Sequence, residues 1–279
     1  MTTTTAGTWS KVGRGFRGAG TRLAYGFGLL IVLMLVWEWA TVSFPSLFFP
    51  PPSKIFESSM QLFFSGPPSQ LFLTEAVTVD VAATVGRMLL GFVLGSVVGV
   101  LVGTAIGRSL LLRQLTDPTV EFLRSIPATA TLPLFIILLG GTDAMRVAFI
   151  AYAVMWFVLI NATSGVASIH RTLIDTGYAF RIGRAKMLFR VILPAALPRI
   201  FAGLRIGATV SLLAAIVSEL MLATNGIGYR LTLAQNMFKM ADLWSWLVLL
   251  AIIGFLLNTA MEIVERKILA WDTLSRTQA

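Results

Sequence analysis

The feature that most constrains this chain is a series of long apolar runs separated by short, mostly basic segments. Each run has about the 20 residues that an α-helix needs to cross the hydrocarbon core of a bilayer. The expected spans cover about 23–44, 81–106, 120–139, 147–169, 200–223 and 243–264. Because backbone polar groups in lipid must be satisfied within each segment, we expect an all-α, polytopic membrane bundle of about six transmembrane helices.

Composition and charge placement agree with this interpretation. Of the 279 residues, 56% are hydrophobic and 13% are charged, whereas soluble domains carry about a quarter charged residues. With the N-terminus inside, 16 Lys and Arg residues fall in inner segments and 4 in outer ones. This bias places both termini in the cytoplasm. The net charge of +9 therefore reflects the basic residues retained on the cytoplasmic side of the membrane. We expect a lipid bilayer as partner, and no nucleic acid. The inner residues are Lys11, Arg14, Arg17, Arg22, Arg108, Arg113, Arg124, Arg171, Arg181, Arg184, Lys186, Arg190, Arg199, Arg266, Lys267 and Arg276, and the outer ones are Lys54, Arg146, Arg230 and Lys239.

The chain divides into three expected regions. Residues 1–22 are small, polar and basic, which is typical of a disordered cytoplasmic tail. Residues 23–265 form the transmembrane domain, with a basic inner loop at about 170–199, and residues 266–279 form a second cytoplasmic tail. A proline-rich linker at 45–52 leads to a short amphipathic helix from Ser53, which we expect in the outer interface.

The sequence offers no catalytic, cofactor-binding or metal-ligating set. It contains no cysteine and a single histidine, His170, which excludes thiolate chemistry and disfavours a histidine-built metal centre. It has no Gly-rich phosphate-binding loop ending in Gly-Lys-Ser/Thr, and no His-Glu-x-x-His or Gly-x-Ser-x-Gly motif. We therefore expect a protein that is not an enzyme and that binds no ATP itself.

Glycine recurs at every fourth position of the second span, at Gly91, Gly95, Gly99 and Gly103. Gly107 continues the same spacing. Such a stripe lets a neighbouring helix backbone approach closely. Two interpretations remain open: helix packing inside one chain, or a sliding or subunit interface.

Two prolines and one acid are candidates for the pathway or its gate. Pro127 and Pro133 should bend the third span, either as a pathway-lining helix or as a simple packing irregularity. Glu219 lies near the outer end of the fifth span, either in a gate or partner role or in a structural hydrogen bond. Arg87 and Arg205 should lie near helix ends, where a long side chain reaches water.

Several short motifs share one order and spacing with a known family. They are Thr84-Val85-Gly86-Arg87 with Gly91-Phe92, Leu123-Arg124-Ser125-Ile126-Pro127, Leu132-Pro133-Leu134, Asn161 with Gly165, Leu193-Pro194, Ala202-Gly203-Leu204-Arg205, and Glu219 with Gly226-Ile227-Gly228-Tyr229. Over roughly residues 25 to 270, the chain resembles the transmembrane permease subunits of bacterial ATP-binding-cassette importers, in the branch for aliphatic sulfonates, taurine and nitrate.

Members of that family carry a cytoplasmic Glu-Ala-Ala loop that docks on the ATPase. Counting back from Leu193-Pro194 without gaps places Asp175 at the Glu position and Thr176-Gly177 at the two alanines. Arg181 falls at the position of the family's glycine, and Gly183 follows two residues later. The resemblance thus implies an ATPase-coupling loop at Asp175, Thr176, Gly177, Arg181, Gly183 and Pro194, with a departure at Arg181.

The resemblance also implies a function and a set of partners. The chain would form the pathway for a small solute such as a sulfonate, taurine or nitrate, and would couple to a separate ATPase through residues 175–198. Two such permease chains, identical or unlike, would meet a dimer of cytoplasmic ATPases that bind ATP, and an extracytoplasmic solute-binding protein, at the bacterial inner membrane. The competing class is a non-transporting membrane scaffold or sensor derived from such a permease, which the departures in the loop favour.

Overall fold

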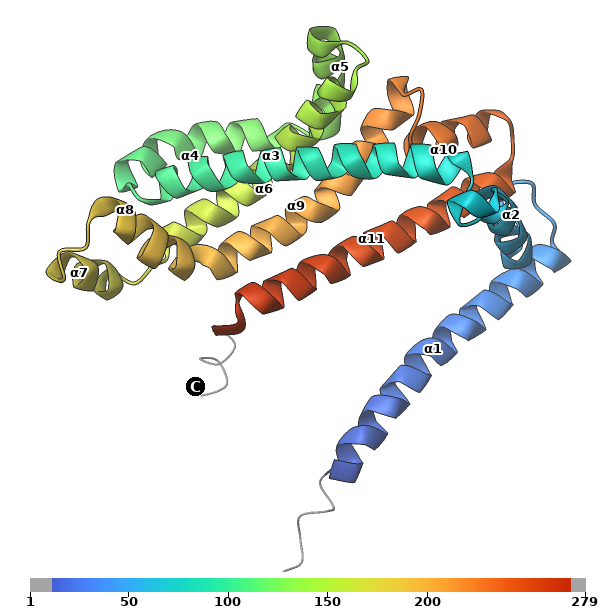
Figure 1. Cartoon of the computed structure of the whole chain (residues 1–279), viewed down its shortest axis with the longest axis horizontal. Coiled ribbons are helices and arrows are strands. Elements are labelled where there is room, and N and C mark those ends of the chain that lie inside the picture. Colours follow the sequence, from blue (N-terminus) through green and yellow to red (C-terminus); the bar gives the residue numbers. More distant parts are fainter. Residues whose placement is uncertain (1–11, 272–279) are drawn as a thin grey trace, which may run out of the picture.

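The computed structural model describes the backbone of residues 12–271 and the side chains of residues 28–69 and 71–271. This part of the chain is helical throughout its regular structure and contains no strand (Figure 1). Its helices, in chain order, are α1 (Val12–Ser43), α2 (Pro52–Phe64), the 3-10 turn η1 (Pro68–Gln70), the π-helix η2 (Ala76–Val81), α3 (Ala82–Gly107), α4 (Leu110–Ser125), α5 (Ala128–Leu139), α6 (Asp143–Ala167), α7 (Arg171–Ala179), α8 (Arg184–Met187), the π-helix η3 (Leu188–Ile192), α9 (Leu193–Leu222), α10 (Ile227–Asn236) and α11 (Met240–Ile268).

Among the described residues, four helical stretches are long and apolar enough to cross a membrane. They are Ala76–Gly107, Asp143–Ala167, Arg184–Leu222 and Met240–Ile268. The pair α4 and α5 makes a fifth if it is one broken span, and α1 has a shorter apolar part at Gly28–Ser43. These segments follow the order of the expected runs, and the membrane-bundle fold is confirmed.

Helices α3, α6 and α9 form the core of the bundle. Met88 from α3, Phe149 and Val154 from α6, and Ala215 from α9 all belong to one buried apolar cluster. The glycine stripe makes the tight contact between α3 and α6. A Cβ built on Gly95 would lie 2.4 Å from the carbonyl oxygen of Ala151, so only glycine permits this spacing. The stripe is therefore occupied by a helix of the same chain.

Several expected helix boundaries were wrong. The structure begins α1 at Val12 rather than near residue 23, and α9 at Leu193 rather than near residue 200. Hydropathy marks how much of a helix is apolar, whereas the backbone hydrogen bonds continue into flanking polar residues. The expected tail at 1–22 is thus helical from Val12, and its residues 1–11 lie outside the described part of the chain.

The third expected span is two helices rather than one bent helix. Helix α4 begins at Leu110 and ends at Ser125, and α5 starts after a bend of 87°. Ile126 has extended backbone angles (φ −73°, ψ 119°), because the ring of Pro127 disfavours helical geometry in the preceding residue. Pro133 lies inside α5 and does not break it. In Figure 1, α5 projects from the top of the bundle, and Leu132 in its middle packs in the buried core cluster.

Helices α1, α2 and α11 meet at one end of the molecule. The Glu38 carboxylate of α1 accepts hydrogen bonds from the Ser53 backbone N–H (3.0 Å) and hydroxyl (2.7 Å) in the first turn of α2. Trp37 and Trp244 pack with ring centroids 5.2 Å apart. Apart from this junction, α1 lies away from the other helices (Figure 1).

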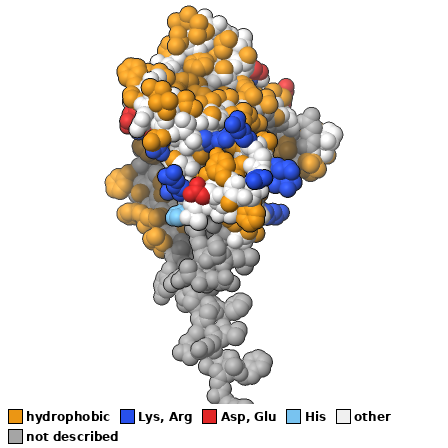
Figure 2. All heavy atoms as spheres, turned by 90° about the vertical axis from the view of Figure 1, so that its left-hand side faces the viewer, with side chains coloured by type: hydrophobic (Ala, Val, Ile, Leu, Met, Phe, Trp, Pro, Cys, Tyr) orange, Lys and Arg blue, Asp and Glu red, His pale blue; other side chains and the backbone are white. Residues whose placement is uncertain are grey.

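The opposite end carries most of the exposed basic charge, and we call it the basic end. It is formed by α7, α8 and the start of α9, and Figure 2 views it directly. The expected loop at 170–199 is therefore mostly helical. Its exposed basic residues are Arg171, Arg181, Arg184, Lys186, Arg190 and Arg199.

The α3–α6 contact yields a matched pair of substitutions. Gly95→Ala places a methyl group against the α6 backbone, and overpacking of this kind costs about 1–3 kcal/mol. Gly86→Ala on the same helix meets nothing within 4 Å and should be neutral or gain up to about 1 kcal/mol, because Ala is the better helix former. Unfolding of the full chain in detergent micelles measures both. Equal stability of the two variants would contradict the contact.

Candidate functional site

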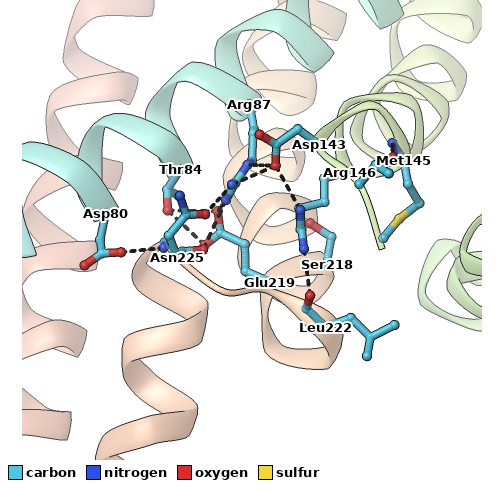
Figure 3. A network of polar contacts seen from close by, with 12 residues as sticks. Asp80, Thr84, Arg87, Asp143, Met145, Arg146, Ser218, Glu219, Leu222 and Asn225 are labelled. Carbon is cyan, nitrogen blue, oxygen red and sulfur yellow. Dashed lines mark hydrogen bonds and ion pairs between the residues drawn. The ribbon is translucent and has the colours of Figure 1, made fainter. Parts of the chain in front are cut away.

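An ion network joins α3, α6, α9 and α10 at the end of the bundle opposite the basic end (Figure 3). Its centre is buried, whereas the Asp143 side chain at its edge is exposed. At its centre, the Arg87 guanidinium of α3 donates to the Glu219 carboxylate of α9, with 2.8 Å between Nη1 and Oε1. Both side chains are almost completely buried, at 6% and 1% exposure. A buried charge is costly unless it is paired and hydrogen-bonded, so each residue depends on the other.

Thr84 and the start of α10 complete the coordination of Glu219. The Thr84 hydroxyl lies 2.8 Å from Oε2, and the backbone N–H of Gly228 donates to the same oxygen at 3.0 Å. The Thr84 oxygen in turn accepts from the backbone N–H of Ile227 at 2.9 Å. The carboxylate thus satisfies an N–H at the start of α10, where helices favour negative charge.

The glycines around Glu219 are required by this geometry. Gly226 has φ +113°, which side-chain-bearing residues rarely adopt, and a Cβ there would lie 2.5 Å from Cδ of Glu219. A Cβ on Gly228 would lie 2.6 Å from Cβ of Glu219. The segment after α9 therefore folds directly over the carboxylate.

Asp143 and Arg146 extend the network to the start of α6. Arg87 Nη2 lies 2.8 Å from Asp143 Oδ1, and Arg146 Nη1 lies 2.9 Å from the same oxygen. Arg146 Nη2 donates to the carbonyl of Leu222, the last residue of α9, at 2.8 Å. One carboxylate therefore bridges two arginines, and the second arginine satisfies an unpaired helix-end carbonyl.

Asp80 anchors the opposite side of the same cluster. Its Oδ1 accepts from the backbone N–H of Gly226 at 2.8 Å, and its Oδ2 accepts from Arg230 Nε at 2.6 Å. The network contains three acids, Asp80, Asp143 and Glu219, and three arginines, Arg87, Arg146 and Arg230. Its formal charges balance, so the cluster carries no net charge with which to attract an ion. This balance favours a structural role, in which the cluster holds the helices together. No group of three or more His, Asp or Glu side chains in the described part of the chain is placed to hold a metal ion.

The sequence had pointed to Glu219 but not to its partners. We expected Arg87 near a helix end in contact with water, and this was wrong, because the carboxylates of Glu219 and Asp143 compensate its burial. Asp80, Thr84 and Arg87 follow one another at about one turn on one helical face. That spacing was the feature of the sequence from which a polar cluster with Glu219 could have been predicted. Arg205, by contrast, is exposed and pairs with Glu265 of α11.

The pathway candidates Pro127 and Pro133 lie away from this network. Pro127 precedes the first residue of α5, at the 87° break, and Pro133 lies within α5. Helix α4 has no buried residue, and only Leu132 is buried in α5. The structure does not bring these prolines together with Glu219.

The coupling candidates lie at the basic end. Asp175 and Thr176 are exposed on α7, whereas Gly177 faces the bundle, where a Cβ would lie 2.6 Å from Sδ of Met187. Met187 belongs to a buried cluster with Ala162 of α6 and Ile200 of α9. Helix α7 therefore packs through its glycine on Met187 of α8, which in turn packs on the core helices.

Arg181 occupies the left-handed position that ends α7. Its φ is +52°, and the N–H groups of Arg181 and Ile182 donate to the carbonyls of Tyr178 (2.9 Å) and Gly177 (3.0 Å). These bonds form a Schellman motif, whose left-handed residue is usually glycine. Gly183 follows as the N-cap of α8, and Pro194 lies in the first turn of α9.

Apolar side chains are exposed beside the basic residues of this end. Tyr178, Phe180 and Phe189 have 65%, 76% and 66% of their surface exposed. Aromatic residues near arginines are typical of protein-binding surfaces. The basic end can therefore contact a partner through both charge and apolar area.

Comparison with known proteins identifies the family. The model of the family described as "Binding-protein-dependent transport system inner membrane component" matches residues 91–269. The chain belongs to this family. It is a multi-pass permease subunit of an ATP-binding-cassette transporter of the bacterial inner membrane, and the family is one of transport components rather than enzymes.

Named relatives cover nearly the whole chain. The taurine transport system permease protein TauC of Escherichia coli (strain K12) is 32% identical over 88% of this chain and 88% of its own length. The putative aliphatic sulfonates transport permease protein SsuC of Bacillus subtilis (strain 168) is 28% identical over 90% of each chain. The nitrate import permease protein NrtB of Synechocystis sp. (strain ATCC 27184 / PCC 6803 / Kazusa) is 26% identical over 85% and 86%.

A solved structure shares the fold. A chain of the MetNI methionine ABC transporter in an inward-facing conformation is 19% identical, covers 68% of this chain and 94% of its own, and superposes with a TM-score of 0.59. The helical architecture described above is thus shared with a chain of this transporter.

The ion network predicts unequal costs for two arginine substitutions. Arg87→Met leaves the Glu219 charge buried without its partner and should lower the free energy of unfolding by about 3–5 kcal/mol. Arg205→Met removes an exposed pair and should cost about 1 kcal/mol or less. Adding Glu219→Gln to Arg87→Met should recover part of the loss. Denaturant titration of the detergent-solubilised full chain gives the three values, and similar costs for both arginines would contradict the assigned burial.

Proposed function

We propose that this chain forms half of the translocation pathway of an importer for a small oxyanion-bearing solute, such as a sulfonate, taurine or nitrate. We also propose that it couples to a separate ATPase through residues 175–198. The observation that carries the coupling proposal is the seat of α7 on the core through Gly177 and Met187. A helix held in this way can pass a displacement to the bundle.

Coupling requires a mechanical link from the basic end to the rest of the span. Helices α8, η3 and α9 form one helical stretch, Arg184–Leu222, of 39 residues, which is ~58 Å long at 1.5 Å per residue. One end carries Arg184 and Lys186 beside α7, and the other carries Glu219 in the ion network. A displacement of α7 and α8 therefore acts on the same helical stretch that carries Glu219 in the ion network at its other end.

A second permease chain is part of the proposal. Helix α4 buries no residue in this chain and α5 buries only Leu132, while Ile137 and Leu138 on α5 are 80% and 69% exposed. A pathway-lining role for Pro127 and Pro133 fits helices that face another copy or an unlike permease. Such a partner would cover the apolar face of α5 and enclose a pathway between the two chains.

The orientation of the importer follows from the basic end. We place this end in the cytoplasm, because Lys and Arg are retained on that side, and there it meets a dimer of ATPases that bind ATP. The ion network and α10 then face outward, toward a solute-binding protein. Residues 1–22 and 266–279 are assigned to the cytoplasmic side.

Arg181→Gly tests the coupling loop. Glycine relieves the left-handed strain, worth about 1–2 kcal/mol, so α7 should become more stable. If the partner ATPase recognises the Arg181 side chain, solute-stimulated ATP hydrolysis should nevertheless fall about threefold, as for a lost interfacial charge contact. The measurement is hydrolysis and solute uptake by proteoliposomes that contain the full chain, its ATPase and its binding protein.

Two variants control this experiment. Arg181→Lys keeps the charge and should retain stimulation, whereas Arg181→Asn keeps a residue that tolerates the left-handed conformation and removes the charge. Unchanged or improved stimulation in Arg181→Gly would remove the proposed role of the side chain. Absence of any stimulation in the wild-type assembly would favour a non-transporting scaffold instead.

A further inference from the structure

An apolar groove lies between α1, α2 and α11, beside the junction where these helices meet, and we call it the α1–α11 groove. Its volume is about 480 Å³. Among the described residues that line it, only Ser59 and Trp37 carry a side-chain nitrogen or oxygen, and the Ser59 hydroxyl donates to the carbonyl of Ile55 in its own helix at 2.7 Å. The other walls are formed by apolar side chains, which include Met34, Phe56, Met60, Val248 and Ile252.

The α1–α11 groove offers almost no hydrogen bond to a polar occupant. A charged solute or an irregular peptide segment would leave its polar groups unsatisfied there, and in a membrane bundle each such group is costly. The occupant must therefore be apolar throughout the part that enters the groove. An acyl chain and a transmembrane helix both meet this requirement.

The size of the groove decides between these two occupants. One turn of an α-helix with its side chains fills about 420–610 Å³, given a diameter of about 10–12 Å and a pitch of about 5.4 Å. The groove would hold roughly one such turn, whereas a helix that crosses the membrane has about five. A single hydrocarbon chain is much narrower than a helix and can lie along the whole groove.

The groove is continuous with the surface that this chain presents to lipid. The most apolar stretch of α11 has no buried residue within the described part of the chain, and Ile252 in the groove is followed by the exposed Phe255 on the same helix. On the opposite wall, Met34 follows the exposed Leu30 and Leu33 of α1. The bilayer that covers both helices therefore reaches the groove without interruption.

We propose that the α1–α11 groove binds one acyl chain of a phospholipid, whose head group lies at the membrane surface beside α2. The proposal goes beyond the transport function and does not depend on it. Tryptophan is enriched where a membrane meets water, so the contact between Trp37 and Trp244 marks the level of the head group. No charged side chain is among the described residues that line the groove. The site therefore recognises the acyl chain and not the head group.

The bound chain gives α1 a second attachment to the bundle. The groove lies where α1 begins to diverge from α11 (Figure 1), and beyond the junction the two helices do not pack on one another. Apolar side chains that face an empty space lose their van der Waals contacts. An acyl chain in the groove restores contacts to both helices and thereby fixes the angle at which α1 leaves the bundle.

Native mass spectrometry of the full chain, purified in detergent from bacterial membranes, tests this proposal. We expect the wild type to retain one phospholipid per chain after other lipids have been washed away. Ile252→Trp fills the groove and should lower the retained fraction about tenfold, which corresponds to the loss of roughly ten atom–atom contacts. Met60→Trp fills it from the α2 wall and should have the same effect. Phe255→Trp changes a side chain that is 70% exposed on α11 outside the groove, and it should leave retention unchanged.

Two results would overturn the assignment to an acyl chain. The first is equal retention, or equal absence, of lipid in the wild type, Ile252→Trp and Phe255→Trp, because lipid would then bind without regard to the groove. The second is a loss of one chain from the purified complex in Ile252→Trp with lipid retention unchanged. That result would assign the groove to a second permease chain, and light scattering of the same samples measures it.

Lipid add-back separates the acyl chain from the head group. The delipidated full chain should bind phosphatidylglycerol and phosphatidylcholine with the same acyl chains to within about threefold. A preference of more than about tenfold for one of them would show that the head group is recognised and would overturn the proposal. Ile252→Leu conserves the side-chain volume and should retain the lipid, and size-exclusion profiles show which variants remain folded. Solute uptake is not a readout here, so failure of this proposal leaves the importer function untouched.

Discussion

The backbone contact between α3 and α6 is the constraint on which the rest of this structure depends. In lipid, two helices gain little from burying apolar side chains against one another, so close approach of small residues supplies the attraction. The glycines Gly91, Gly95, Gly99, Gly103 and Gly107 bring the C-terminal two thirds of α3 against the α6 backbone. Every other core helix packs on the surface that this pair creates.

The ion network uses the alignment that this contact provides. Arg87 on α3 and Asp143 at the start of α6 meet only because the two helices run side by side without slipping. Glu219 then reaches them from α9, and the glycines after α9 let α10 close over the carboxylate. A buried ionic cluster contributes little net stability by itself, but it specifies one arrangement, because every alternative leaves a charge unpaired.

The sequence was informative wherever one physical requirement decided the structure. Apolar length and basic flanks predicted the membrane bundle, and glycine spacing predicted a close helix contact. The partner of the glycine stripe could not be chosen, because a stripe of small residues is equally suited to any helix. The position of Arg87 was predicted wrongly, since its burial depends on acids 56 and 132 residues away. The break before Pro127 was underestimated, because proline permits either a bend or a full stop, and tertiary contacts decide between them.

The two ends of α9 differ in how their backbone and side chains are held. Its C-terminal end is held by Glu219 in the ion network, whereas its N-terminal end, at the basic end, follows a π-helix, η3, and carries Pro194 and Pro198 within its first turns. Proline and π geometry both remove regular backbone hydrogen bonds from a helix, so bending is easiest there. Helices α7 and α8 attach at this softer end, and α4 lies free of buried contacts nearby. A displacement applied at the basic end would therefore deform the adjacent half of the bundle first. It could reach the ion network only along α9, whose far end is held by the contacts of Glu219 with Arg87, Thr84 and the backbone N–H of Gly228.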